Sequence, residues 1–397
     1  MALPFGASTP SVISVSVAVQ PWLSWCGTGL AACTMGYSIA ACLAVRLRRG
    51  HSLPGAGPMP PVTVLKPVCG AERDLYECLR SFCEQAYPRF QVVFGAQAPD
   101  DPAIAVVRRL QGEFQGLDLQ LVINQARHGS SGKVSNLINM MPLARYDYLV
   151  VADSDIRVTP DYLAKVVPPL LGSDVGIVTC AYRGRSRPES WSILESAFIN
   201  DWFMPSVYVA AMLGSRAFAF GATIALRREV LARIGGFGLI ADQLADDYRL
   251  GELTRRIGLR TVLSDAVVET SVHERSCRDL VRHQLRWLRT IRAVRPGGYA
   301  LSFMTLGLAP AAFGVWAAAG ARAAMLMLTI TAVARLMLHF GSRNARTALL
   351  ELWVVPVGDL LVFALWCWGF VTSRVQWHQV LYRVRPDGSL HPITRRA

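Results

Sequence analysis

Two aspartates separated by one residue follow a run of apolar residues in the stretch VADSDIRV, residues 151–158. The apolar run is typical of a buried strand, so Asp153 and Asp155 should lie where that strand ends. Carboxylates at this spacing can direct their oxygens to one side of a turn and hold a hard divalent cation, which would neutralise a diphosphate. A structural turn or helix cap before the segment TPDYL is the alternative. The spacing alone leaves both interpretations open.

Two other clusters carry groups capable of chemistry. The first is Asp246 and Asp247, in LADDYRLGEL at the start of an expected helix, where acidic residues also favour the helix N-terminus for structural reasons. The second is Arg286 beside Trp287, in HQLRWLRT, which a basic amphipathic helix on a membrane surface would explain equally well. Taken singly, each cluster fits a structural role.

The elements that position these residues alternate between strand and helix patterns. Strands are predicted in PPVTVLKP, FQVVFGAQ, LQLVINQ and YDYLVVADSD, with helices between them at residues 75–85, 103–114 and 134–140. This alternation predicts a mostly parallel sheet covered by helices, in which ligands bind at the carboxyl ends of the strands. Asp153 and Asp155 fall at such an end. The chain contains neither GxGxxG nor a P-loop motif, which disfavours a dinucleotide enzyme or a P-loop ATPase.

Long apolar segments bracket this middle part. The chain is 52% hydrophobic, and residues 22–45 carry no charge, which exceeds the roughly 20 residues that span a bilayer. Arginines follow the segment rather than precede it, which predicts an uncleaved anchor with the next residues in the cytoplasm. Residues 299–320, 323–341 and 352–373 predict two or three further membrane helices, the first of which could instead lie in the interface. Arg335 and Asp359 fall at membrane depth and are expected to form a structural pair.

The predicted organisation therefore has four parts. They are a membrane anchor at residues 1–50, a cytoplasmic domain at 55–295, membrane segments at 296–375 and a basic tail at 376–397 that contains Arg383, Arg385, Arg395 and Arg396. Three C-terminal crossings would place this tail outside the cytoplasm, whereas two would keep it inside.

The formal net charge of +13 requires anionic partners. Seven arginines lie between residues 275 and 295, immediately before a membrane segment, so we expect them to meet anionic lipid headgroups and a phosphate-bearing substrate rather than nucleic acid. The nine cysteines are scattered without CxxC spacing, which indicates neither a disulfide framework nor a zinc site.

Seven segments taken in order resemble the ceramide glucosyltransferase family of membrane glycosyltransferases, and look closest to its bacterial branch associated with hopanoid biosynthesis. They are VTVLKPVCGAERDL, DDPAIAVVRRL, GKVSNLINMMP, VADSDIRVTPDYL, GATIALRREVL, LADDYRLGEL and HQLRWLRT. The resemblance implies a GT-A fold, a UDP-sugar donor, a divalent cation such as Mg²⁺ or Mn²⁺, and inversion at the anomeric carbon. It also implies transfer to a lipid hydroxyl on the cytoplasmic face, and hence a multi-pass protein of the bacterial inner membrane.

The resemblance assigns roles to individual residues. Asp153 and Asp155 match the metal and diphosphate motif, and Asp247 matches the aspartate expected to act as general base on the acceptor hydroxyl. Lys133 and Asn136 match a KxxN segment expected near the donor pyrophosphate and ribose.

The remaining assignments concern the donor and the closing motif. Glu72 stands where the family carries a nucleotide-holding aspartate. Asp100 and Asp101 match an acidic turn on the donor side, where Asp246 is also expected. Arg286 is expected to stabilise the leaving UDP, and Trp287 to pack against the sugar or acceptor. His283 occupies the first place of the closing motif, where the family usually has Gln or Arg.

The acceptor remains open between several interpretations. We favour transfer of N-acetylglucosamine from its UDP form to a bacteriohopanetetrol-type hopanoid, since animal ceramide enzymes carry His-Pro where this chain has Met204 and Pro205. Glucosyl transfer from UDP-glucose to ceramide is the alternative. A processive polysaccharide synthase shares the aspartates and the Arg-Trp pair but normally needs more membrane helices. A non-catalytic membrane scaffold with the same fold is a fourth interpretation. Residues 206–226 could line an acceptor path or simply pack in the core.

Overall fold

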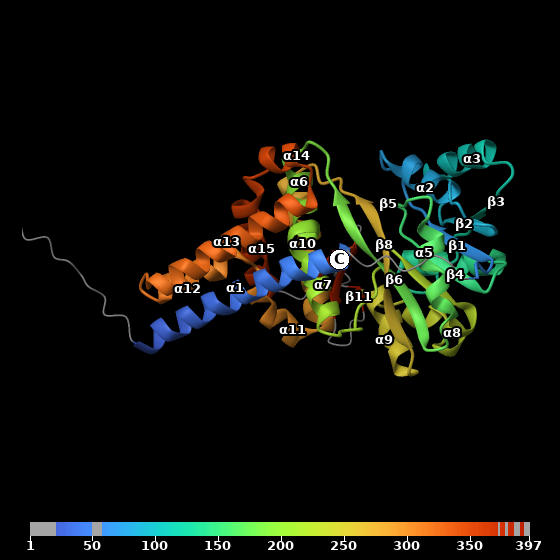
Figure 1. Ribbon diagram of the computed structural model, residues 1–397. Helices are drawn as coiled ribbons and strands as arrows, with labels where there is room; N and C mark the ends of the chain where they lie inside the picture. The colour runs from blue at the N-terminus through green and yellow to red at the C-terminus, as the bar shows by residue number, and fades with distance from the viewer. Residues whose placement is uncertain (1–20, 50–57, 372–373, 378–379, 385–389, 393–397) are drawn as a thin grey trace, which may run out of the picture.

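The computed structural model describes residues 21–49, 58–371, 374–377, 380–384 and 390–392. A body built around one large sheet lies at one end of the molecule, and long apolar helices extend from the other end (Figure 1). The sheet contains eight strands in the order β3-β2-β1-β4-β7-β6-β8-β5. These strands are β1 (Val62–Pro67), β2 (Phe90–Ala96), β3 (Asp118–Ile123), β4 (Tyr148–Val151), β5 (Ile156–Arg157), β6 (Val175–Arg185), β7 (Ile224–Arg227) and β8 (Arg260–Ser271).

The first half of the sheet is parallel, which confirms the predicted architecture. Strand β1 pairs in parallel with β2 and β4, and β2 pairs in parallel with β3. Successive strand residues face opposite sides, because Val64 and Val150 belong to one buried cluster and Leu65 and Val151 to another. Helices α2 (Leu75–Cys83) and α3 (Ala103–Glu113) cover the first side, and α4 (Gly132–Met140) covers the second.

The second half of the sheet is mixed. Strand β7 is antiparallel to both β4 and β6, whereas β6 and β8 are parallel and β5 is antiparallel to β8. The helical elements of this half are α5 (Tyr162–Val166), α6 (Ser190–Ala197), the π-helix η3 (Phe198–Phe203), α7 (Met204–Met212), α8 (Arg228–Arg233) and α9 (Asp246–Arg256). The short 3₁₀ helices are η1 (Met141–Leu143), η2 (Pro168–Leu171), η4 (Phe237–Ile240) and η5 (Ser302–Thr305).

Helix α1 and the helices that follow β8 form a separate layer beside this body (Figure 1). They are α1 (Pro21–Arg49), α10 (Cys277–Val294), α11 (Pro296–Leu301), α12 (Leu308–Ala317), α13 (Arg322–Ser342), α14 (Ala345–Leu350) and α15 (Val354–Gly369). Two described helices, Pro21–Arg48 and Arg322–Ser342, are long and apolar enough to cross a membrane. The segment predicted from 299 to 320 instead forms two helices that bend by 76° around Leu306 and Gly307, and the α15 helix has only 16 residues.

In the C-terminal tail, β9 (Arg374–Trp377), β10 (Val380–Val384) and β11 (Leu390–Pro392) form a small antiparallel sheet. Three of the tail arginines named above, Arg385, Arg395 and Arg396, lie outside the described residues.

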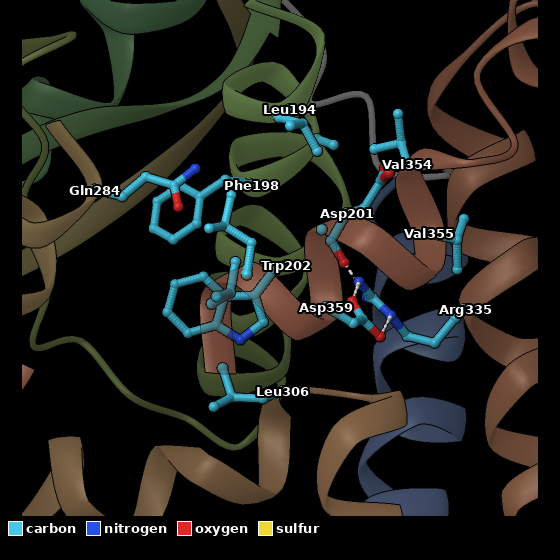
Figure 2. Close-up of a pocket in the computed structure, with 14 residues that line it drawn as sticks. Leu194, Phe198, Asp201, Trp202, Gln284, Leu306, Arg335, Val354, Val355 and Asp359 are labelled. Atoms are coloured by element: carbon cyan, nitrogen blue, oxygen red, sulfur yellow. Dashed lines mark hydrogen bonds and ion pairs between the residues drawn. The ribbon is translucent and has the colours of Figure 1, made fainter. Parts of the chain in front are cut away.

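A buried polar network joins α13 and α15 to the body. Arg335 of α13 pairs with Asp359 of α15, with 3.0 Å between Nε and Oδ2, which confirms the predicted pair. Arg335 also donates to the backbone carbonyl of Asp201 in η3 (Figure 2). The Asp201 carboxylate in turn lies 2.8 Å from the Arg343 guanidinium and 3.3 Å from the His339 ring nitrogen. A buried arginine and aspartate that satisfy each other in this way fix the position of η3 against α13 and α15.

Candidate active site

Lys133 lies between the aspartates of two different motifs. It is the second residue of α4, whose N-cap Ser131 accepts a hydrogen bond from Val134 N. Its Nζ is 2.6 Å from Asp153 Oδ1, just beyond β4, and 3.5 Å from Asp246 Oδ2, at the start of α9. The charges of the two aspartates raise the pKa of Lys133 despite its burial, which acts in the opposite direction. The ammonium is therefore firmly charged, and it joins three elements that are far apart in the sequence.

Asp247 is held in a fixed orientation beside this group. Its Oδ2 accepts from Gly221 N at 2.9 Å, and its Oδ1 accepts from Tyr248 N at 2.7 Å. Burial, together with the charge of Asp246, raises the pKa of Asp247 to about 6, although Lys133 and the two backbone hydrogen bonds oppose the change. The carboxylate is thus ionised at neutral pH and more basic than an ordinary aspartate.

Gly221 lies at the centre of these charged groups. Because β7 runs antiparallel to β4, with Ile224 opposite Val151, the turn before β7 reaches the carboxyl end of β4. A Cβ atom at Gly221 would lie 2.9 Å from Asp153 Oδ2, 3.1 Å from Lys133 Nζ and 3.6 Å from Asp247 Oδ2. The three side chains therefore surround one point of backbone, where a Cβ atom would push the ends of the Asp153 and Lys133 side chains aside.

The second aspartate of the VADSD segment is held by groups from other strands. Asp155 Oδ2 accepts from Thr270 Oγ1 at 2.7 Å, and burial followed by the charge of Asp153 raises the pKa of Asp155. Beneath the segment, Lys66 of β1 donates to the backbone carbonyl of Asp153. Burial lowers the pKa of Lys66 to about 8. These contacts make the turn after β4 rigid.

The closing motif approaches from α10. Burial lowers the pKa of Arg286, while the negative charges of Glu195, Asp153, Glu274 and Asp155 act in the opposite direction. Trp287, the next residue, packs edge-on against Tyr182, Phe198 and Phe203, with ring centroids 5.2 to 6.2 Å apart. Phe218 and Phe220, just before Gly221, extend this aromatic layer toward the aspartates.

His283 belongs to a group of carboxylates behind Arg286. Its Nδ1 lies 2.5 Å from Glu274 Oε1 and 3.6 Å from Glu195 Oε1, and Gln284 Nε2 donates to Glu195 Oε2 at 2.9 Å. Glu195 is fully buried, and burial raises its pKa to about 7. The hydrogen bond to Glu274 raises the pKa of His283 against the effect of burial. This pairing explains how a histidine can replace the usual residue of the motif while α10 stays in place.

The other residues singled out in the sequence lie nearer the first strands. Glu72 is 3.3 Å from the His273 ring and lines a cavity of about 390 Å³ that also includes Glu274 and Arg187. Asn136 is buried on α4 and donates to the backbone carbonyl of Gly95 at the end of β2.

In the acidic turn after β2, Asp101 has a structural function. Asp101 accepts from Gly70 N and Ala103 N, each at 2.9 Å, so it joins the turn after β1 to the start of α3. Asp100 is exposed on the same turn. Ion pairs link Lys133 directly to Asp153 and Asp246, and the Gly221 backbone lies between these groups and Asp247. The roles of the site residues in donor binding and catalysis stay predictions.

Sequence reasoning did not single out several residues that shape the site. Gly221 is within the segment GATIALRREVL, but nothing in its spacing reveals that the turn meets Asp153 and Asp247. Tyr182 and Glu195 belong to no recognisable motif. The one available signal is the charged Glu195 between the apolar Leu194 and the small Ser196 and Ala197, which indicates a buried partner.

Carboxylate oxygens are the ligands that Mg²⁺ and Mn²⁺ prefer, and Asp153 and Asp155 supply them from one short turn. Asp153 already contacts one cation, the Lys133 ammonium, at 2.6 Å. Glu195, Glu274 and His283 also bring ligand-type atoms within 4.8 Å of one another, but their mutual ion pairs and the hydrogen bond from Gln284 account for that arrangement.

Known proteins share this fold and these segments. The mannosyltransferase PcManGT from Pyrobaculum calidifontis, solved with GDP-Man and Mn²⁺, superposes with a TM-score of 0.52 at 23% identity, covering 88% of this chain and 96% of that one. The likeness shows a GT-A-like glycosyltransferase fold. Ceramide glucosyltransferase 3 of Caenorhabditis elegans is 23% identical over 255 residues, 63% of this chain and 55% of that relative.

A ceramide glucosyltransferase of Candida albicans is 30% identical over 139 residues, 32% of this chain and 25% of that relative. The chain thus spans about half the length, or less, of these curated relatives. The model of glycosyl transferase family 21 matches residues 28–390, which include most of α1, the whole large sheet and the apolar helices that follow it. With a match of this extent, the chain belongs to glycosyl transferase family 21.

Proposed function

We propose that this protein transfers a sugar, with inversion, from a UDP-sugar to the hydroxyl of a membrane lipid. The observation that carries the proposal is the arrangement around Gly221, where a basic, oriented Asp247 lies beside the cationic Lys133 and the Asp153 carboxylate. One side of this arrangement suits proton abstraction from an acceptor. The other suits a charged leaving group.

The acceptor side follows from the environment of Asp247. Each carboxylate oxygen accepts one backbone N–H and keeps a lone pair for another donor. Asp247 takes the proton of the acceptor hydroxyl, and the acceptor oxygen forms a bond to the anomeric carbon. The bond from that carbon to the diphosphate oxygen breaks, and UDP leaves with the electron pair. A single displacement of this kind inverts the configuration at the anomeric carbon.

The donor side follows from the cationic groups and the cavity. Lys133 and Arg286 direct positive charge to the region of Asp153 and stabilise the negative charge that develops on the leaving UDP. Asp153 and Asp155 would hold the divalent cation, which supplies charge neutralisation of the diphosphate when bound. The volume of the cavity lined by Glu72 lies within the range of small-molecule sites, and we assign the nucleoside of the donor to this cavity.

The membrane helices suit a lipid acceptor. A soluble donor can reach the sheet edge, while α1 and α13 would keep the domain beside a substrate that stays in the bilayer. We place the domain on the cytoplasmic side of a bacterial inner membrane, on account of the arginines at the C-terminal end of α1. Within this class we favour UDP-N-acetylglucosamine and a bacteriohopanetetrol-type hopanoid. The names of the curated relatives favour a second candidate, UDP-glucose and ceramide.

Radiolabelled donors separate these candidates. Membranes that contain the full chain are incubated with labelled UDP-N-acetylglucosamine or UDP-glucose, in the presence of hopanoid or ceramide, and the lipids are analysed by chromatography and mass spectrometry. We expect label from UDP-N-acetylglucosamine in the hopanoid, and none with Asp247→Asn. Asp147→Asn, at a carboxylate that is 85% exposed, is the matched control and should keep full activity. Label in neither lipid would contradict both candidates.

A further inference from the structure

Two arginines from separate elements converge around Tyr248, the residue after Asp247, and the backbone of a third lies beside one of them. Arg295, at the end of α10, donates from Nε to Tyr248 Oη at 3.2 Å, and its guanidinium lies 5.8 Å from the ring centroid. Arg255, on α9, has its guanidinium 5.9 Å from the same ring. Arg255 Nη1 also donates to the backbone carbonyl of Arg216, at 3.3 Å. Arg295 and Arg255 thus meet at one ring, and the contact of Arg255 brings the backbone of Arg216 beside them.

This cluster has no acidic partner of its own. Among the described residues, no carboxylate lies within ion-pair distance of Arg216, Arg255 or Arg295. The nearby Glu252 is already engaged by Arg249 and Arg256. Burial lowers the pKa of Arg255, Tyr248 and Glu252 act in the opposite direction, and the charge of Arg295 adds to the decrease. An anion placed between Arg255 and Arg295 would offset the closeness of their two positive charges.

Apolar side chains accompany the cluster. Met212 and Leu213, at the end of α7, are 45% and 78% exposed, and Arg216 follows three residues after Leu213. Leu301, on the helix that follows Arg295, is 62% exposed. In Figure 1 the end of α7, α11 and α9 lie on the same lower side of the molecule. Exposed leucines beside arginines are typical of segments that enter the headgroup layer of a membrane.

We propose that Arg216, Arg255 and Arg295 bind the phosphate of an anionic membrane lipid. The exposed side chains of Met212, Leu213 and Leu301 enter the acyl region next to that headgroup. The occupant is a lipid rather than a soluble phosphate, because the exposed Leu213 and Leu301 stand three and six residues from Arg216 and Arg295 in the sequence, and α10 leads directly into the apolar helices. This inference rests on the membrane attachment in the proposed function, but not on the identity of the sugar or the acceptor.

The site would also act on catalysis through Tyr248. The Tyr248 N–H holds Asp247 Oδ1, and a phosphate that binds Arg255 and Arg295 would fix both guanidinium groups against the Tyr248 ring. The start of α9, and with it the Asp247 carboxylate, would then be better ordered. We therefore expect anionic lipid to raise the turnover of the acceptor without being consumed.

Lipid binding is measured first, without reference to sugar transfer. The full chain is placed in nanodiscs of phosphatidylcholine with or without phosphatidylglycerol, and native mass spectrometry counts the phosphatidylglycerol that it retains. Each arginine near a membrane surface is worth a factor of about five in binding, so R216Q/R255Q/R295Q should weaken retention on the order of 100-fold. The matched control, R89Q/R108Q/R233Q, removes the same charge at exposed positions on the sheet body and should retain the lipid.

Three further arms make the outcome decisive. Because Arg255 contacts the Arg216 backbone, R216Q/R295Q is measured as well; it leaves that contact intact and should weaken retention about 25-fold. Equal loss in the control triple, or binding of soluble glycerol phosphate as tight as that of the lipid, would overturn the proposal. Turnover of the native protein should rise with phosphatidylglycerol and that of the triple variant should not. If no donor is turned over, the proposed function fails while the retention result still stands.

Discussion

Replacement of Asp247 by asparagine tests the proposed base most directly. The change removes the charge and the proton acceptor but keeps nearly the same volume, so the loop and α9 should remain in place. One of the two backbone N–H donors, from Gly221 or Tyr248, loses its partner, because the amide nitrogen of asparagine cannot accept. The loss of a buried carboxylate with a raised pKa offsets that cost in stability.

The expected loss of rate follows from the role of the group. A general base contributes about 100-fold to 10,000-fold, which is about 3 to 5 kcal/mol of activation free energy. The native enzyme should also show the pKa of about 6 in its pH dependence. About 90% of Asp247 is ionised at pH 7 and about 10% at pH 5, so kcat/KM should fall by about tenfold between them. An aspartate with an ordinary pKa would give almost no change over this range.

The assay follows UDP release by purified protein in nanodiscs that contain the acceptor, from pH 4.5 to 8.5. Glu195→Gln serves as the control, because Glu195 has a pKa of about 7 and could otherwise produce a similar profile. The reasoning would be refuted by a native rate that stays flat down to pH 5, or by full UDP release from Asp247→Asn. If Glu195→Gln shifted the pH profile, the titration would belong to Glu195 and not to Asp247.

The remaining predictions concern packing and buried charge. Gly221→Ala should raise KM for the donor at least tenfold, because its Cβ would displace Asp153 and Lys133, whereas Gly116→Ala, which points into open space, should have no effect in the same steady-state assay. Arg335→Leu should lower the thermal midpoint strongly, since an unpaired buried charge costs about 3 to 5 kcal/mol. Adding Asp359→Leu should restore part of the loss, and a double variant no better than the single one would exclude a coupled pair. Glu195 has a folded pKa of about 7, above its ordinary value of 4.5, so the folded state binds the extra proton and stability falls as pH rises from 4.5 to 7. Glu195→Gln should remove on the order of 3 kcal/mol of that dependence, measured as the difference in thermal midpoint between pH 5 and pH 8.

Much of the first half of the fold could be predicted from local patterns. The four strands from residue 62 to residue 151 and the helices between them are confirmed, because alternating burial within strands and apolar stripes on helices are written directly into neighbouring residues. The same patterns located Asp153 and Asp155 at the end of β4. They also predicted that Arg335 and Asp359 would pair, because unpaired charges at that depth are too costly.

The residue types, their order and the apolar segments were thus determined by the sequence itself, because propensity, periodicity and hydropathy are properties of short windows. The grouping of Lys133, Asp153 and Asp247 around Gly221 was decided by the tertiary structure, because it depends on an antiparallel β7 inserted beside β4. The same is true of the raised pKa of Asp247 and of the cationic cluster around Tyr248. Burial and the distance between charges arise only when segments more than 20 residues apart are packed together, and no local pattern records them.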